Sequence, residues 1–399
     1  MKIVTFGCRI NTYESNLIRS FLKTREDVIV VNTCAVTAEA ERQCRQTIRK
    51  LARENPTSKL IVTGCAVQLH PDVYAKMPEV SFVLGNREKL DPAFFETKEK
   101  VCVRAIDETP FEIPLVRELE GSVRAFLQIQ QGCDHQCTFC IVRAVRGKSQ
   151  SLSPEQVLQE AVFLSEKGFS EIVLTGIDLT SYAYGLAELI RKILKQAPGI
   201  KRIRLGSLDP AGVDDDLIRL FAKEERLMPH AHFSVQAGDN LILKRMGRRH
   251  TREQVMALCA RLKEVRPDMV FGADLIAGFP TETQEAFQNT LDLVQKTGLI
   301  LLHVFPFSSR PGTPSAKMPM VPVSVRKKRA MELRALGKKQ LHTYLCQQVG
   351  KKETVLVEEK GTGLNAHYIR TYVPEEIPVG SLVQIINKGV KEDALLGTP

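Results

Sequence analysis

The sequence predicts an α/β protein whose parallel strands alternate with helices, followed by a small β-barrel at the carboxyl end. Over most of the 399 residues, short apolar, β-branched runs alternate with polar segments of helical length, which is the pattern of βαβ units. After Gly350 the chain changes to short strand-like runs separated by glycine and proline. That second pattern is typical of a small barrel.

The amino-terminal part carries a cysteine at the end of each expected strand. These strands are 2–7 before Cys8, 28–33 before Cys34 and 59–64 before Cys65. Because open α/β sheets bind ligands at the carboxyl ends of their strands, we expect these three thiols, the strand triad, to share a site. The alternative is three core cysteines that fall there by chance. The isolated Cys44, Cys102, Cys259 and Cys346 are expected to be buried hydrophobic residues.

The middle of the chain predicts a longer α/β unit that starts with a strand at 125–130. A helix is expected from Ser153, since serine at the N-cap, proline next and Gln156 after it form a strong start signal. Strands are expected at 171–175, 202–205, 232–235, 270–275 and 302–305. With helices between them, they predict a barrel or partial (β/α) barrel whose site lies at the carboxyl ends of its strands.

The predicted boundaries divide the chain into three units and one linker. They are an amino-terminal βαβ parallel-sheet domain (1–106), a linker with Pro110 and Pro114 (107–120), a central α/β domain (121–348) and a small β-barrel (349–399). A basic helix is expected at 323–348, and barrel strands at 354–358, 367–373 and 382–386.

Three further cysteines lie in one short loop after the strand at 125–130. Cys133, Cys137 and Cys140, the loop triad, have the spacing C-x3-C-x2-C. Three thiolates so close together can hold three corners of an iron–sulfur cube and leave the fourth iron open, whereas ferredoxins fill all four corners with cysteine. A zinc site with His135 as fourth ligand, or simple buried thiols, are the alternatives.

Bulk properties favour a soluble enzyme with a polyanionic partner. The formal charge is +10 and the pI about 9.1, which favours nucleic acid. Tryptophan is absent and aromatics are only 6%, which argues against a wide base-stacking surface. No apolar run reaches membrane-spanning length and Met1 leads directly into a strand. We therefore expect no membrane partner, no signal peptide and a cytoplasmic location, where ten cysteines favour metal ligation over disulfides.

At this point the residues match a known family. The two cysteine sets occur with the runs Ala144–Gly147, Leu174–Asp178, Ser234–Gly238, Lys244–Arg249 and Ala273–Glu282. With these motifs, the chain resembles the methylthiotransferases of the radical S-adenosylmethionine (SAM) superfamily over essentially its whole length. The carboxyl end resembles a TRAM domain, a small barrel that binds RNA. Ala237 and Thr281 replace the serine and glycine usual in the family.

Two motifs narrow the resemblance to one subgroup. Phe6–Glu14 and His303–Ser308 are similar to enzymes that modify N6-threonylcarbamoyladenosine next to the anticodon of tRNA. Related enzymes methylthiolate isopentenyladenosine in tRNA or a ribosomal protein, and these remain alternatives. A non-catalytic iron–sulfur RNA-binding protein is the alternative from another class.

The resemblance implies two [4Fe–4S] clusters, one on the loop triad and one on the strand triad. It also implies SAM as cofactor, tRNA as substrate, a flavodoxin- or ferredoxin-type electron donor and a methylthio group placed on carbon 2 of the adenine. The sulfur donor stays open. Contacts with SAM or substrate are expected from Phe139, Gly176, Ile177, Asp178, Gln236 and Asp274. A loop anchor for Phe139 and a plain strand-exit turn for Gly176–Asp178 are the alternatives.

Basic residues near the expected barrel suggest where RNA binds. They are Arg326, Lys327, Lys328, Arg329, Lys351 and Lys352. Their position next to the barrel favours phosphate contact, although solvated helix faces would explain each group alone.

Overall fold

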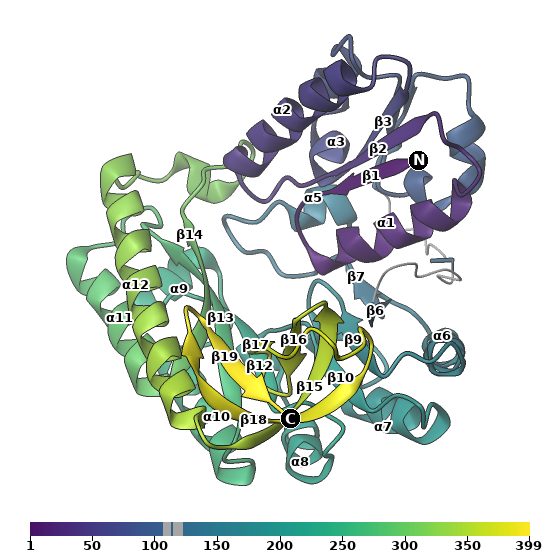
Figure 1. Cartoon of the computed structure of the whole chain (residues 1–399). Coiled ribbons are helices and arrows are strands. Elements are labelled where there is room, and N and C mark those ends of the chain that lie inside the picture. The colour runs from purple at the N-terminus through teal and green to yellow at the C-terminus, as the bar shows by residue number, and fades with distance from the viewer. Residues whose placement is uncertain (107–112, 115–122) are drawn as a thin grey trace.

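The computed structural model describes residues 1–106, 113–114 and 123–399 (Figure 1). The linker expected at 107–120 lies outside these residues except for Ile113 and Pro114. The expected fold class is confirmed: a parallel sheet is followed by a curved α/β unit and a closed barrel.

The amino-terminal sheet contains five parallel strands in the order in which they occur in the sequence. They are β1 (Lys2–Thr5), β2 (Val28–Thr33), β3 (Lys59–Gly64), β4 (Phe82–Leu84) and β5 (Val101–Cys102). The helices are α1 (Arg9–Phe21), α2 (Ala38–Glu54), α3 (Cys65–Leu69) and α4 (Pro71–Ala75). β2 is buried along its whole length, because neighbouring strands flank it and helices cover its two faces.

The central unit is a half-open parallel barrel formed by two adjoining sheets, β10-β9-β6 and β11-β12-β13-β14. The strands are β6 (Arg124–Gln128), β9 (Glu171–Thr175), β10 (Arg202–Leu205), β11 (Ser207–Leu208), β12 (His230–Gln236), β13 (Val270–Ala277) and β14 (Leu299–Pro306). Outer helices include α6 (Pro154–Glu166), α7 (Leu186–Gln196), α8 (Asp215–Lys223), α9 (Asn240–Met246), α10 (Arg252–Val265), α11 (Gln284–Thr297) and α12 (Val323–Gln348). The expected capping box of α6 is present between Ser153 and Gln156.

The carboxyl-terminal residues form a closed five-stranded barrel in the order β15-β16-β17-β19-β18. Its strands are β15 (Lys352–Glu359), β16 (Thr362–Asn365), β17 (Arg370–Tyr372), β18 (Leu382–Lys391) and β19 (Ala394–Thr398). In Figure 1 this yellow barrel lies in front of the teal central strands, while the purple amino-terminal sheet lies above them in this view.

The structure adds elements that sequence periodicity did not indicate. Strands β4, β5, β16 and β19 were not expected, because each is short or contains polar residues and glycine, which weakens the alternation signal. Cys44, Cys102 and Cys259 are buried as expected, but the prediction for Cys346 was wrong, since this residue is exposed on α12. Among the described residues, no helix combines the length and apolar character needed to cross a membrane.

Candidate active site: two cysteine triads

The loop triad lies in the segment that connects β6 to α6, where a short two-stranded sheet closes the base of the loop. Its strands are β7 (Gln130–Gln131) and β8 (Gln150–Ser151). The loop is also held by Thr138, whose backbone N–H donates to Met246 O (2.9 Å) and whose hydroxyl donates to Arg245 O (2.8 Å). These bonds fix the cysteine loop to the end of α9.

A glycine permits the close packing of this loop. Gly132 has φ +66°, and a Cβ at this position would lie 1.9 Å from Lys148 O. No L side chain fits so close to a backbone carbonyl, so the residue before Cys133 is restricted to glycine.

Each thiol of the loop triad accepts a hydrogen bond. The backbone N–H of His135 donates to Cys133 Sγ (3.4 Å), and that of Val142 donates to Cys140 Sγ (3.4 Å). The Arg248 guanidinium donates to Cys137 Sγ (3.4 Å). Burial raises the pKa of Cys133 to about 11 and of Cys140 to about 12, and the charges of neighbouring cysteines add to this. The thiols are therefore close enough to couple electrostatically.

The strand triad is assembled from three strand ends. Cys8 is the N-cap of α1, Cys34 follows β2, and Cys65 begins α3 directly after β3. Burial raises the pKa of Cys34 to about 12, with further contributions from Cys65 and Cys8. Gly7 (φ +95°) makes room here, since a Cβ on it would lie 2.8 Å from Cys34 Sγ. The structure thus brings the three cysteines together as the sequence predicts.

A short helix, α5 (Val142–Arg146), connects the two triads. It begins two residues after Cys140, and its Val145 carbonyl accepts a hydrogen bond from Asn86 Nδ2 (2.7 Å). The same amide nitrogen lies 3.8 Å from Cys65 Sγ. The loop triad and the strand triad therefore have one rigid element in common.

Arg146 at the end of α5 belongs to a buried charge cluster beside the strand triad. Its guanidinium pairs with Glu14 Oε1 at 2.7 Å, and Lys89 Nζ pairs with the other oxygen of Glu14 at 2.6 Å. The exposed fraction of each of these three side chains is 2% or less. Although burial acts to lower it, the charges of Cys65 and Glu14 hold the pKa of Arg146 well above its ordinary value.

The charge of this cluster shows whether the residues around the strand triad fit an iron–sulfur group. Two cations and one carboxylate leave one net positive charge buried next to Cys65, and buried charge needs an opposite partner. Thiolate ligands carry negative charge, and hydrogen bonds to sulfur are usual around such clusters. The strand triad with Arg146 and Lys89, and the loop triad with Arg248, therefore fit thiolate-ligated clusters.

The turn after β9 lies next to the loop triad. Gln130 Oε1 accepts hydrogen bonds from the N–H groups of Ile177 (2.9 Å) and Asp178 (3.1 Å), and a Cβ on Gly176 would lie 2.9 Å from the same atom. His135 Nε2 is 2.9 Å from Asp178 Oδ2. The imidazole of His135, the alternative fourth zinc ligand, thus contacts the carboxylate of Asp178. Gln130 holds Gly176–Asp178 in a turn.

Sequence reasoning missed Asp209, which lies at the centre of this region. It is 2% exposed and contacts Arg248 (3.3 Å) and Arg249 (3.1 Å), as well as His135 (3.6 Å) and His250 (3.5 Å). Although burial acts to raise it, His250, Arg248, the backbone N–H of Ala211 and Arg249 hold the pKa of Asp209 well below its usual range. Asp209 lies outside any sequence motif. Only its position after a strand could have indicated that it belongs to the site.

The remaining expected contact residues lie on β12, on β13 and in the cysteine loop. Asp274 Oδ1 is 3.1 Å from His232 Nε2 and 3.2 Å from His303 Nδ1. Gln236 ends β12 with φ +72°, a backbone conformation that side chains other than glycine rarely adopt. Phe139 packs edge-on against Phe279, with ring centroids 6.3 Å apart, so it anchors the loop. Contact of these residues with a cofactor stays a prediction.

The basic residues expected to bind RNA divide into two kinds. Arg329 is buried and pairs with Glu282 at 2.7 Å, and Arg326 donates to Phe307 O at 2.7 Å. These bonds fix α12 to the strands and loops of the central unit. The side chains of Arg329 and Arg326 are therefore used inside the protein, and we no longer expect them to contact RNA. Lys327 and Lys328 are exposed.

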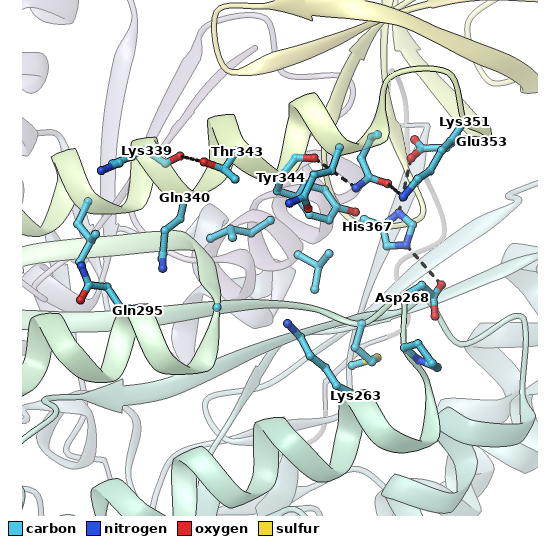
Figure 2. A pocket seen from close by; sticks show the side chains of 18 of the residues that line it. Lys263, Asp268, Gln295, Lys339, Gln340, Thr343, Tyr344, Lys351, Glu353 and His367 are labelled. Carbon is cyan, nitrogen blue, oxygen red and sulfur yellow. Dashed lines mark hydrogen bonds and ion pairs between the residues drawn. The ribbon is translucent and has the colours of Figure 1, made fainter.

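Lys351 and Lys352 line a pocket of about 630 Å³ between α12, the start of β15 and the loop before β13. Figure 2 shows Lys263, Lys339 and Lys351 around it, and the ion pair between His367 and Asp268. None of the six triad cysteines lines this pocket. The pocket is basic and lies at the junction of the small barrel with the central unit, so it suits phosphate contact.

Comparison with known proteins agrees with this arrangement. Residues 127–294 match the family model described as "Radical SAM superfamily", and residues 1–85 match "Uncharacterized protein family UPF0004". A threonylcarbamoyladenosine tRNA methylthiotransferase MtaB from Rickettsia prowazekii (strain Madrid E) is 45% identical, covering 98% of this chain and 95% of the relative. The MtaB of Aquifex aeolicus (strain VF5) is 34% identical, covering 96% and 98%. A tRNA-2-methylthio-N(6)-dimethylallyladenosine synthase from Zymomonas mobilis is also 34% identical, covering 96% and 93%.

A solved structure supports the fold. The radical SAM methyltransferase TsrM from Kitasatospora setae superposes with a TM-score of 0.53 at 16% identity, covering 77% of this chain and 67% of TsrM. At this identity the likeness concerns the fold alone. From the near-complete match to the MtaB sequences, we conclude that this chain belongs to the threonylcarbamoyladenosine tRNA methylthiotransferase family of the radical SAM superfamily.

Proposed function

We propose that this chain transfers a methylthio group to carbon 2 of N6-threonylcarbamoyladenosine next to the anticodon of tRNA. The observation that carries the proposal is the presence of two cysteine triads that α5 connects, since α5 follows Cys140 and shares the Asn86 amide with Cys65. An enzyme that only cleaves SAM needs one triad, whereas delivery of sulfur to the same base calls for a second metal site nearby. The family membership and the full-length match to the MtaB relatives support this choice.

In this proposal, the loop triad Cys133, Cys137 and Cys140 would hold the [4Fe–4S] cluster that binds SAM. The strand triad Cys8, Cys34 and Cys65 would hold the second cluster. When bound, the first cluster would supply the one-electron chemistry that makes carbon 2 of the adenine reactive, and the second would hold the sulfur before its transfer.

The residues of the chain itself would bind the clusters, orient SAM and the substrate, and exclude water from the site. Arg248 and two backbone N–H groups donate to the loop thiols. The Gly176–Asp178 turn, Gln236 and Asp274 are proposed to position SAM and substrate at the carboxyl ends of the strands, where barrel enzymes carry their sites. The amino-terminal sheet is proposed to cover this end and exclude water.

The tRNA partner is proposed to bind through the barrel of residues 349–399 and through Lys327, Lys328, Lys351 and Lys352. The domain limits 1–106, 121–348 and 349–399 belong to the same proposal, with the linker between the first two. A flavodoxin- or ferredoxin-type protein is proposed as electron donor, and the cytoplasm, where tRNA is modified, as the location.

The test is nucleoside mass spectrometry of tRNA from cells that lack this chain and from cells that receive it back. We expect loss and recovery of 2-methylthio-N6-threonylcarbamoyladenosine, with the isopentenyladenosine product unchanged. Loss of the isopentenyl product instead would favour the second candidate function, methylthiolation of isopentenyladenosine. The 34% identity to the Zymomonas enzyme supports this candidate.

A further inference from the structure

Arg9 reaches from the amino-terminal sheet to the small barrel. It is the first residue of α1 and directly follows Cys8 of the strand triad. Its Nη2 donates to the hydroxyl of Tyr368 (3.0 Å), and its Cζ lies 5.4 Å from the centre of the Tyr368 ring. A side chain next to a proposed cluster ligand therefore ends at the turn between β16 and β17.

Arg9 differs from the other arginines around Tyr368 in its ion pairing. Arg124 pairs with Glu358 and lies 3.8 Å from Glu171, and Arg204 pairs with Glu171 at 2.7 Å. Within the described ranges 1–106, 113–114 and 123–399, Arg9 has no carboxylate partner. It is half-buried, and a partly desolvated cation is stabilised when an anion binds beside it.

Tyr368 is held in a demanding conformation for this contact. Its φ is +66°, a region that side chains other than glycine adopt rarely and often at functional sites. Its ring stacks on the buried His230 at 5.1 Å. Burial acts to raise the pKa of Tyr368, but the charges of Arg9 and Arg124 lower it overall. The surroundings of its hydroxyl are thus electropositive.

The Tyr368 hydroxyl can also donate a hydrogen bond to a ligand. Its oxygen accepts from Arg9 and from Arg124 Nη1 (3.3 Å). No acceptor for its proton is found in the described part of the chain. A carboxylate placed between Arg9 and Tyr368 would therefore receive one charge-assisted bond from the guanidinium and one from the phenol.

The proposed substrate has the matching group. Threonylcarbamoyl on N6 ends in a carboxylate, whereas the isopentenyl substituent of the related substrate is apolar and uncharged. Asp274 lies between His232 and His303, on the strand next to the one that carries His230 and His232. A carboxylate beside Asp274 would meet like charge, so Arg9 is the more favourable partner.

We propose that Arg9, assisted by Tyr368, binds the carboxylate of the threonylcarbamoyl group and so selects this adenosine over the isopentenyl form. The inference rests on the proposed function, because it names the group that recognises that substrate. Arg9 is thereby a specificity-determining residue.

The test compares two anticodon stem-loop RNAs that differ in one group. One carries threonylcarbamoyladenosine, and the other carries its carboxamide analogue, in which the carboxylate is replaced by a neutral amide. Affinities for the iron-loaded full chain are measured by fluorescence anisotropy for the wild type, Arg9→Gln and the control Arg19→Gln. Arg19 lies in the last turn of the same helix, α1. Iron content is measured for each protein, because Arg9 adjoins Cys8.

We expect the wild type and Arg19→Gln to bind the carboxylate RNA about tenfold more tightly, the effect of a hydrogen bond to a charged group. Arg9→Gln should lose this preference and still bind the carboxamide RNA like the wild type. Equal weakening for both RNAs would assign Arg9 to a phosphate and overturn the inference, and so would an unchanged preference.

A second variant guards against misfolding of Arg9→Gln. Tyr368→Phe leaves Arg9 and Cys8 in place and should reduce the preference by about threefold, the effect of a neutral hydrogen bond. An unreduced preference in Tyr368→Phe contradicts a hydrogen bond from the Tyr368 hydroxyl to the carboxylate. If Arg9→Gln cannot be purified as a folded protein, the same result contradicts the inference as a whole. Methylthiolation of the carboxylate RNA by the wild type is assayed in parallel. Failure there rejects the proposed function, whereas activity with a retained preference in Arg9→Gln rejects only this inference.

Discussion

The two cysteine triads bring three thiols together in different ways. The loop triad lies within one short segment, and its geometry is set by local backbone bonds and by Gly132. The strand triad collects its cysteines from three strand ends that are distant in the sequence. The first triad therefore requires an ordered loop, whereas the second exists only when the amino-terminal sheet is folded. Metal binding at the strand triad should be coupled more strongly to global stability.

The second contrast concerns charge. The loop triad receives a guanidinium, Arg248, from the unit in which it lies. The strand triad lies beside Arg146, which comes from the segment after Cys140. Part of the positive charge beside the strand triad thus comes from the segment that follows the loop triad, and the rest comes from Lys89 of the amino-terminal unit.

The largest expected effect separates the chemical roles of the triads. Cys133→Ala should abolish SAM cleavage to 5′-deoxyadenosine, because one ligand of the SAM-binding site is lost. Cys34→Ala should retain part of this cleavage but give no methylthio product. Chromatography of cleavage products and nucleoside mass spectrometry measure the two outcomes. Full product from Cys34→Ala would show that the assignment of the strand triad is wrong.

Substituting the two glycines tests whether each triad has its own local requirement. Gly132→Ala should lower iron bound by the loop triad, since the new Cβ meets a carbonyl at 1.9 Å. Gly7→Ala should affect the strand triad alone, where the contact is with Cys34 at 2.8 Å. Iron and sulfide analysis after anaerobic reconstitution measures both.

Gly312→Ala is the control for the glycine pair. Gly312 has φ +84°, but no atom lies within 4 Å of the position that a Cβ would take. It therefore tests backbone strain alone, about 1 kcal/mol. Equal iron loss in all three variants would contradict the local effect of the two close contacts.

Arg146→Gln tests the charge that connects the triads. The substitution removes hydrogen bonds from Arg146 to both oxygens of Glu14 but leaves Glu14 paired with Lys89. Losing hydrogen bonds to a charged group costs about 1.5–3 kcal/mol, so the urea midpoint should fall. Arg143→Gln on the same helix, where the side chain is exposed, should change the free energy of unfolding by less than about 0.5 kcal/mol. Similar urea midpoints for the two variants would argue against the buried charge cluster.

The smallest expected effect is on the reduction potential of the cluster proposed for the loop triad. Arg248→Gln removes a positive donor from Cys137 Sγ and should make the potential more negative by about 40 mV, a hydrogen bond of about 1 kcal/mol expressed for one electron. Arg249→Gln is the matched control, because Arg249 contacts Asp209 but no sulfur. Spectroscopic redox titration distinguishes the two, and an equal shift would indicate a general charge effect.

The sequence by itself determined the fold class, both sets of cysteines and the positions of several helices. α12 covers the expected residues 323–348, and α6 begins where the local capping signal of Ser153 and Gln156 predicts. The loop triad was readable for the same reason, since its ligands occupy one segment. The short strands β4 and β5 were missed, because a buried strand of two or three residues has no period to detect.

Only the tertiary structure decided how the charged residues are used. Arg329 looked like part of a basic surface but is buried against Glu282, while Asp209 carried no signal and yet holds Arg248 beside the loop triad. The contact of Arg9 with Tyr368 joins the two ends of the chain. Such pairings depend on distances between segments remote in sequence, and electrostatic energy depends on those distances and on burial, neither of which local spacing encodes.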